Sequence, residues 1–199
     1  MMQYNIYITG VGGQGVVKTS IVIGQACIKQ GLNVVTSEIH GMSQRGGVVP
    51  VEVRIGDVNG PIIKKGGADL LLSFEPLEAL RALPKLNENT FAVVNTGEIV
   101  PFTASLGISE YLSSDEYLSE LKKYLKVVIP VNAEAIAKEV GDSILSNMVI
   151  LGVGASVPNF PLKKEFIVEA IKENFKPQYV NLNIKAFEKG FEIGEANFK

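Results

Sequence analysis

Short apolar runs and longer segments of helical periodicity alternate along the chain. Six of the runs are rich in Val, Ile and Leu, as strands buried in a sheet are. They span residues 4–9, 33–39, 48–55, 69–74, 91–95 and 127–131. Each run is too short for a stable helix, so the pattern predicts six β-strands.

Between and after these runs, apolar residues recur at helical spacing. The first such segment ends before Gly31, a residue type that often stops helices. Ser113 and Glu116 have the spacing of a capping box, and Asn132 and Gly141 mark the two ends of another helix. The predicted helices span residues 16–30, 77–83, 117–124, 132–140, 148–157, 163–175 and 182–193.

The order of these elements predicts an α/β fold. Strands that alternate with helices are typical of a three-layer α/β/α arrangement with a mostly parallel central sheet. The first strand, the helix after it and the second strand form a Rossmann-like βαβ unit, in which we expect parallel strands joined by a right-handed connection. No linker or repeat interrupts the sequence, so we expect residues 1–199 to form a single domain.

Composition narrows the classes of function. The 19 basic and 21 acidic residues are well mixed and give a formal net charge of −2, so the chain has no basic field for a nucleic-acid backbone. One cysteine, Cys27, is too few for a disulfide or a four-cysteine metal site. Neither a secretion signal nor an apolar run of about 20 residues is present. We expect a cytoplasmic protein with neither nucleic acid nor membrane as a partner.

A glycine-rich turn stands where the first strand meets the first helix. Gly10, Gly12 and Gly15 form a G-x-G-x-x-G pattern, and Gly13 and Gln14 complete the turn. Such a turn lets a phosphate approach backbone N–H groups at the positive end of a helix. We therefore interpret all five residues as candidates for cofactor binding. The alternative is that the glycines only allow strand, turn and helix to pack closely.

Two kinds of nucleotide site resemble this turn. Glu38, at the end of the second strand, is placed like the ribose-binding acid of a Rossmann dinucleotide site. Residues 12–19 nearly match a phosphate-binding P-loop, but Val17 replaces its second glycine and would obstruct the turn. Lys18 remains able to lean toward an anion. A nicotinamide or flavin enzyme stays open, whereas nucleotide hydrolysis is disfavoured.

A second polar loop, containing Ser43, Gln44 and Arg45, follows the second strand. Because the ends of parallel neighbouring strands meet at one edge of a sheet, we expect this loop near the glycine-rich turn. Arg45 offers a forked cationic donor for phosphate or carboxylate, and the other two add neutral hydrogen bonds. We interpret all three as further cofactor-binding candidates. The alternatives are a loop braced by its own side chains or docked on a partner protein.

The sequence identifies neither a catalytic residue nor a metal site. His40 is the only histidine, and no nucleophile accompanies it in a recognised pattern. Cys27 falls near the apolar side of the first helix and is interpreted as a core residue. Glu75 is interpreted as a cap for the helix that follows it rather than as a catalytic carboxylate.

The glycine-rich turn and the second loop together resemble a known family. Residues 10–17 (GVGGQGVV) and 37–47 (SEIHGMSQRGG) resemble the gamma-type module of 2-oxoacid:ferredoxin oxidoreductases. Within that family, the resemblance is greatest to the beta subunit of indolepyruvate:ferredoxin oxidoreductases. Further matches extend it over nearly the whole chain, at residues 67–69, 74–76, 147–148 and 183–187.

This resemblance implies a subunit of a larger oxidoreductase that is not active alone. In the family, thiamine diphosphate attacks the oxoacid, CO2 leaves, electrons pass through iron–sulfur clusters to ferredoxin, and coenzyme A takes the acyl group. The chain lacks the Gly-Asp-Gly opening of the usual thiamine-diphosphate motif and the cysteines for a cluster. Thiamine diphosphate and the iron–sulfur clusters are therefore expected in a large alpha subunit, which is the partner of this chain. Ferredoxin is expected as the electron acceptor and coenzyme A as the co-substrate.

The resemblance implies an enzyme that acts on indolepyruvate and related arylpyruvates, and two alternatives to it remain open. Pyruvate, a branched-chain 2-oxoacid or 2-oxoglutarate would keep the family and change the substrate, because substrate selection is expected largely in the missing subunit. A stand-alone dinucleotide-binding Rossmann protein would instead bind a nicotinamide or flavin cofactor as a single chain.

Overall fold

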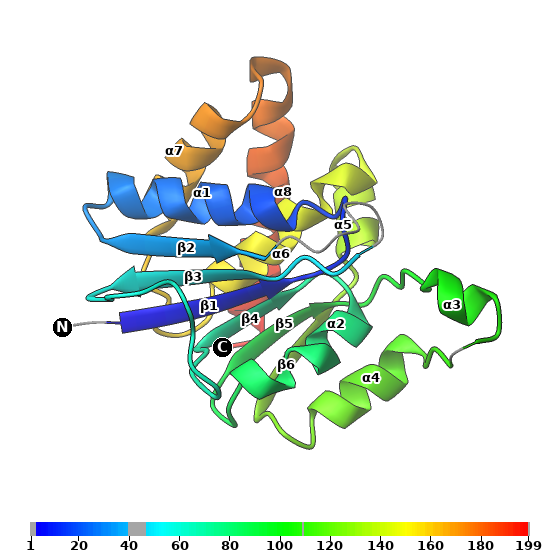
Figure 1. Ribbon diagram of the computed structural model, residues 1–199. Helices are drawn as coiled ribbons and strands as arrows, with labels where there is room; N and C mark the ends of the chain where they lie inside the picture. The colour runs from blue at the N-terminus through cyan, green and yellow to red at the C-terminus, as the bar shows by residue number, and fades with distance from the viewer. Residues whose placement is uncertain (1–2, 40–46, 109, 199) are drawn as a thin grey trace.

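The computed structural model describes residues 3–39, 47–108 and 110–198, and its strands form one six-stranded sheet (Figure 1). The strand order is β2-β3-β1-β4-β5-β6. β1, β4, β5 and β6 are mutually parallel, and β3 is antiparallel to both of its neighbours. The strands are β1 (Gln3–Thr9), β2 (Val34–Glu38), β3 (Val51–Gly56), β4 (Leu70–Ser73), β5 (Phe91–Asn95) and β6 (Val127–Val131).

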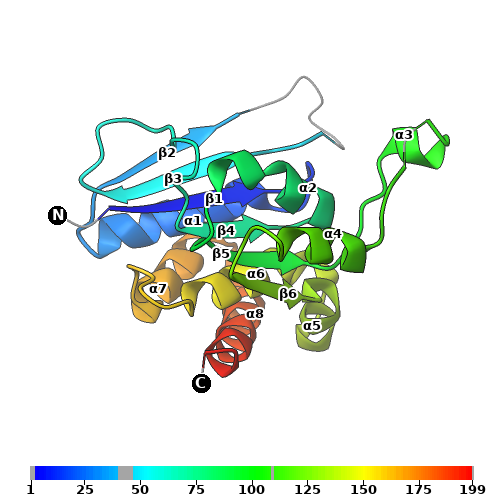
Figure 2. The ribbon, with the colours of Figure 1, turned by 90° about the horizontal axis from the view of Figure 1, so that it is seen from below.

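Helices cover both faces of this sheet, as Figures 1 and 2 show. One face carries α1 and α5 to α8, and the other carries α2 and α4. The helices are α1 (Val16–Lys29), α2 (Pro76–Arg81), α3 (Phe102–Ser105), α4 (Ser114–Leu121), α5 (Ala133–Val140), α6 (Ser146–Ala155), α7 (Lys164–Asn174) and α8 (Pro177–Ala196), with 3-10 turns at Leu83–Lys85 and Ser143–Leu145. The predicted α/β class with a mostly parallel, helix-flanked sheet is confirmed.

Each predicted strand and helix is present; the strands at residues 91–95 and 127–131 have their predicted bounds, and the ends of the other elements differ by a few residues. Ser113 and Glu116 form both hydrogen bonds of the capping box, but the helix begins with them, at Ser114, and not at residue 117. Asn132 caps α5 and Gly141 ends it, as expected. The four-residue helix α3 was not predicted, because residues 96–112 carry no helical periodicity.

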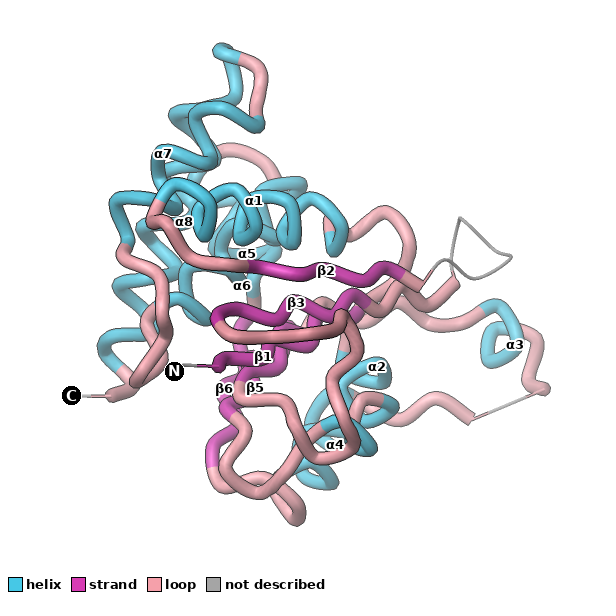
Figure 3. The backbone as a smooth tube through the Cα atoms, turned by 60° about the vertical axis from the view of Figure 1, so that its left-hand side comes forward, coloured by secondary structure: helices cyan, strands magenta, loops and turns pink. Residues whose placement is uncertain are grey.

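The expected βαβ unit is wrong in one respect. β2 points in the same direction as β1, but β3 lies between them and pairs antiparallel with each. The residues of β3 alternate so that Val51, Val53 and Ile55 are all fully buried, whereas every residue of β2 is at least partly exposed. Since the strand with the more apolar face gains more by occupying an inner position, β3 takes the place beside β1 and β2 forms the edge under α1 (Figure 3).

The two faces of the sheet have separate hydrophobic cores. Along β4, Leu70 and Leu72 point into the core under α1 and α6, and Leu71 points into the core under α2 and α4. Successive strand side chains face opposite sides, so one short apolar run contributes to both cores. This explains why the parallel strands are apolar at nearly every position.

Helix α6 is buried along its whole length, as predicted for residues 148–157. It crosses α8 at Gly152 and Gly190, where the backbones are in contact. A Cβ on Gly152 would lie 2.7 Å from the backbone N of Phe191 and 3.0 Å from the carbonyl carbon of Gly190. The glycines therefore allow α6 to lie between the sheet and α8. Within the described residues, no helix has the length and hydrophobicity needed to cross a bilayer.

Candidate functional site

The glycine-rich turn joins the end of β1 to the start of α1, and its glycines serve different purposes. A Cβ on Gly10 would lie 2.8 Å from Gln14 Oε1 and 2.9 Å from Phe74 Cβ, so this glycine allows close packing. Gly15 has φ +83°, and a Cβ there would lie 2.6 Å from Asn147 Nδ2. Gly13 has φ +105° and nothing within 4 Å of a Cβ position. Close packing thus explains Gly10 and Gly15, while Gly13 borders open space.

Gln14 braces the turn from within. Its Oε1 accepts the backbone N–H of Val11 at 2.7 Å, and its Nε2 donates to the carbonyl of Phe74 at 2.7 Å. These bonds tie the turn to the end of β4. Gln14 therefore holds the backbone shape, and its amide head is already occupied.

The far end of the second polar loop lies against the same turn. The backbone N–H of Gly12 donates to the carbonyl of Gly47 at 2.9 Å, and that of Val49 donates to Gly10 at 2.9 Å. The premise that β1 and β2 are neighbours is wrong, yet the two loops do meet through residues 47–49. Ser43, Gln44 and Arg45, like His40, lie outside the described residues, so their predicted role stays a prediction.

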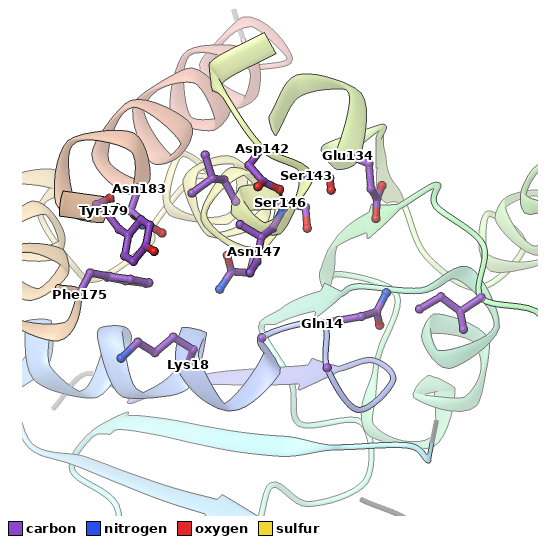
Figure 4. Close-up of a pocket in the computed structure, with 15 residues that line it drawn as sticks. Gln14, Lys18, Glu134, Asp142, Ser143, Ser146, Asn147, Phe175, Tyr179 and Asn183 are labelled. Atoms are coloured by element: carbon purple, nitrogen blue, oxygen red, sulfur yellow. Dashed lines mark hydrogen bonds between the residues drawn. The ribbon is translucent and has the colours of Figure 1, made fainter. Parts of the chain in front are cut away.

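A cavity of about 730 Å³ opens beside the glycine-rich turn (Figure 4). α1, α5, α6, α8 and the 3-10 turn before α6 all contribute to its wall. The lining residues are Gly13, Gln14, Gly15, Lys18, Ile99, Glu134, Asp142, Ser143, Ile144, Leu145, Ser146, Asn147, Phe175, Tyr179 and Asn183. Its volume falls in the range of small-molecule binding sites. Of the five turn residues proposed for cofactor binding, Gly13, Gln14 and Gly15 line the cavity, and Gly10 and Gly12 do not.

The start of α1 gives one wall of the cavity a positive potential. The N-cap residue Gly15 has no side chain to cap the helix, and the first turn contains no acidic residue. Among the described residues, no backbone acceptor reaches the N–H groups of Val16, Val17 or Lys18. A helix N-terminus in this state attracts an anion through its free N–H groups and the helix dipole.

Lys18 lies in the same wall but is turned away from the glycine-rich turn. Its Nζ donates to the carbonyl of Asn174 at 2.6 Å, at the C-terminal end of α7, and lies 4.8 Å from the centroid of the Phe175 ring. Figure 4 shows it beside Phe175 and Tyr179. The ammonium group therefore joins α1 to α7 and adds positive charge at one end of the cavity.

Sequence reasoning from the turn missed two polar residues that line the cavity, Asn147 and Glu134. Asn147 is 6% exposed, accepts the backbone N–H of Met148 through Oδ1 at 3.0 Å, and extends toward the start of α1 (Figure 4). Glu134 accepts from Asn95 Nδ2 at 2.9 Å through Oε1, while its buried Oε2 has no hydrogen-bond partner. These residues come from α6 and α5, more than 100 positions along the chain from the turn, so only folding brings them to it.

The other residues that were considered for chemistry lie outside the cavity, and Cys27 and Glu75 have structural roles. Cys27 is fully buried, and burial raises the pKa of its thiol to about 12, so the interpretation as a core residue is confirmed. Glu75 caps α2 by accepting the N–H of Glu78 at 3.0 Å, also as predicted. Glu38 ends the edge strand, two strand spacings or roughly 10 Å from β1, which is wrong for a Rossmann ribose acid. The described residues contain no group of three potential metal ligands.

Known proteins resemble the chain over almost its full length. The family model "Pyruvate ferredoxin/flavodoxin oxidoreductase" matches residues 5–193. The chain is 48% identical over 190 residues to the indolepyruvate oxidoreductase subunit IorB of Methanothermobacter thermautotrophicus, a match that covers 96% of this chain and 97% of that protein.

Solved structures share the fold. The gamma subunit of a keto/oxoacid ferredoxin oxidoreductase from Geobacter sulfurreducens superimposes with a TM-score of 0.75 at 26% identity and covers 98% of both chains. A 2-oxoglutarate:ferredoxin oxidoreductase from Magnetococcus marinus, with 2-oxoglutarate, coenzyme A and succinyl-CoA bound, also gives a TM-score of 0.75, at 21% identity. That match covers 98% of this chain but 32% of the longer one. A unit of this fold therefore occurs both as a separate subunit and within a longer polypeptide.

Proposed function

Because the chain belongs to the pyruvate ferredoxin/flavodoxin oxidoreductase family, and within it to the group of the IorB subunits, we propose that it serves an enzyme acting on indolepyruvate and related arylpyruvates. The complex would convert the arylpyruvate, coenzyme A and oxidised ferredoxin into the arylacetyl-CoA, CO2 and reduced ferredoxin. The observation that carries this proposal is the 48% identity to an indolepyruvate oxidoreductase subunit over nearly the whole of both chains.

The redox chemistry is assigned to a large companion subunit in the cytoplasm. Thiamine diphosphate would supply the carbanion chemistry of decarboxylation, and iron–sulfur clusters would carry the electrons to ferredoxin. The residues of this chain do not fit a cluster, because its one cysteine is buried and remains protonated to high pH. We assign residues 1–199 as one domain that completes the complex, since a single sheet carries both hydrophobic cores.

For this chain itself, we propose that the cavity beside the glycine-rich turn holds the phosphate-bearing part of coenzyme A. The free N–H groups at the start of α1 suit a phosphate, and Gly13 leaves room for one to approach. Phe175, Tyr179 and Ile144 provide an apolar wall for the less polar parts of the molecule. The cavity thereby binds and orients the co-substrate, leaving its thiol end free to reach the acyl group in the companion subunit.

The first experiment tests the substrate. The complex of this chain with its large companion subunit is purified anaerobically, and coenzyme A-dependent reduction of ferredoxin is measured with indolepyruvate, pyruvate and 2-oxoglutarate. The highest kcat/KM is expected for indolepyruvate. A preference for another oxoacid would keep the family and overturn the substrate, and a lack of activity with every oxoacid would overturn the function.

A second experiment tests the cavity with two variants of equal size. Gly13→Asp places a negative charge at the start of α1, and Gly13→Asn places a neutral amide there in the same backbone conformation. The KM for coenzyme A is expected to be about tenfold higher in the aspartate variant than in the asparagine variant, with the KM for indolepyruvate equal in both. Equal values for coenzyme A would show that its phosphates do not bind at this position.

A further inference from the structure

An arm, of which the structure describes residues 96–108 and 110–113, projects from the body of the molecule between β5 and α4. Figure 2 shows its helix α3 standing clear of the sheet and of every other helix. Among the described residues, six of the thirteen large hydrophobic side chains with high exposure lie in this arm. They are Ile99 (41% exposed), Val100 (48%), Phe102 (77%), Leu106 (57%), Ile108 (72%) and Leu112 (39%). So dense a group of exposed apolar side chains in a short segment is the mark of an interaction surface.

The base of the arm is fixed to the body by specific contacts. Glu98 Oε1 accepts the backbone N–H of Ser114 at 2.6 Å, which closes the two ends of the arm together. The Tyr111 hydroxyl donates to the buried carboxylate of Glu75, and the Tyr111 ring packs edge-on against Tyr117 with 5.3 Å between centroids. Burial and the hydrogen bond to Glu75 raise the pKa of Tyr111, so this hydroxyl remains a donor. An arm held in place before binding loses less conformational entropy when it docks.

A pocket of about 360 Å³ lies where the arm meets the glycine-rich turn. Val11 and Val48 line one side, and residues 99–102 of the arm line the other. Glu78 lines the pocket and is 3% exposed, with one carboxylate oxygen bonded to Arg81 at 2.6 Å. Its other oxygen, Oε2, is buried without a hydrogen-bond partner. Because Glu75 also lines the pocket, the floor of the pocket beside the apolar arm is acidic.

We propose that the arm and this pocket together form the surface that docks on the large companion subunit of the oxidoreductase, which covers the apolar side chains of the arm and presents basic side chains to the carboxylates around it. This inference rests on the proposed function, because it takes the companion subunit as the occupant. The longer Magnetococcus chain, of which this fold makes up 32%, is consistent with a much larger body beside such a unit.

The charges around the surface favour that occupant over a second copy of this chain. Glu75, Glu78, Glu98 and Glu110 lie in or beside it, and among the described residues that line the pocket Arg81 is the only basic one. In a symmetric dimer an acidic patch would be paired with an equally acidic patch, whereas a different protein can present basic side chains to it. A companion subunit with apolar and basic side chains would complement both the arm and the acidic residues around it.

The test measures the affinity of this chain for the companion subunit by titration, with circular dichroism to verify that each variant is folded. The double variant Phe102→Ser/Ile108→Ser is expected to weaken binding by roughly 30-fold or more, since large apolar anchors dominate such interfaces. Ile28→Ser is the matched control, because Ile28 is 64% exposed on α1, and it is expected to bind like the wild type.

Each outcome supports or overturns the docking surface, separately from the proposed function. Wild-type affinity in the arm variant would overturn the surface, even if the wild-type complex oxidises indolepyruvate. A dimer of this chain alone that the arm variant dissociates would assign the surface to a second copy, and failure of the wild type to bind the companion would overturn the proposal. If the arm variant loses binding while the wild-type complex acts on no 2-oxoacid, the docking surface stands and the proposed function falls.

Discussion

The crossing of α6 and α8 makes a prediction whose sign and size follow from the structure. The change is Gly152→Ala, which adds one methyl group where the two helices touch. That methyl would overlap the carbonyl oxygen of Phe187 and lie 2.7 Å from the backbone N of Phe191. Because all the nearest atoms belong to backbone, no side chain can rotate to make room. The helices must move apart.

The expected loss of stability is about 2 kcal/mol. Overpacking of a core typically costs about 1–3 kcal/mol, and contact with rigid backbone places this case near the upper end. Alanine regains about 1 kcal/mol relative to glycine in a helix interior. Gly24 in α1 provides the control, since a Cβ there meets nothing within 4 Å. Gly24→Ala should therefore stabilise the protein by about 0.5–1 kcal/mol.

Urea unfolding, followed by circular dichroism, measures both variants. With a denaturant slope of about 2 kcal/mol/M, the midpoint should fall by about 1 M for Gly152→Ala and rise by a few tenths of a molar for Gly24→Ala. The opposite signs separate the helix crossing from the general effect of replacing glycine. A midpoint for Gly152→Ala equal to that of the wild type would refute the close approach of the two helices.

Three further predictions concern single side chains. Lys85 Nζ pairs at 2.8 Å with the carboxylate of Glu52, which is 1% exposed. Lys85→Met should therefore lower the free energy of unfolding by about 3 kcal/mol, measured by urea titration. A loss under about 0.5 kcal/mol would contradict the pairing. Because burial raises the pKa of Cys27 to about 12 from an ordinary 9.0, its contribution to stability should decline from about pH 9 toward pH 12. At pH 8.5, iodoacetamide should then label the native protein only as fast as it unfolds, and faster labelling would show an accessible thiol. Gln14→Ala removes two hydrogen bonds of the glycine-rich turn and should cost about 2 kcal/mol in thermal or urea unfolding, whereas an unchanged stability would show that the turn holds its shape without them.

The local features of this chain follow closely from its sequence. The strand at residues 91–95 was predicted with its observed bounds, and the caps at Asn132 and Glu75 were predicted with their observed roles. Each depends on neighbouring residues, through alternation of apolar side chains or a hydrogen bond to the first helical turn. The family was also recognised from residues 10–17 and 37–47, and the family match over residues 5–193 confirms it.

The position of β3 is the clearest failure of sequence reasoning. The run at residues 48–55 was predicted as a strand, but no local signal gives its direction or its neighbours. Its place between β2 and β1 depends on how well the apolar face of each strand packs under α1. Different orders of the strands in the whole sheet must be compared to decide this. The Rossmann interpretation of Glu38 failed for the same reason.

The candidate site divides in the same way. The sequence alone determined that a glycine-rich turn precedes α1, that the chain lacks cysteines for a cluster, and that it belongs with oxoacid oxidoreductases. Folding determined that Asn147 packs against Gly15 of that turn and that Glu134 lines the same cavity. It also determined that Gln14 braces the turn and that the apolar side chains between β5 and α4 are exposed on an arm. Turns and caps form from residues close in the chain, whereas a cavity or an exposed face depends on packing between residues far apart in it.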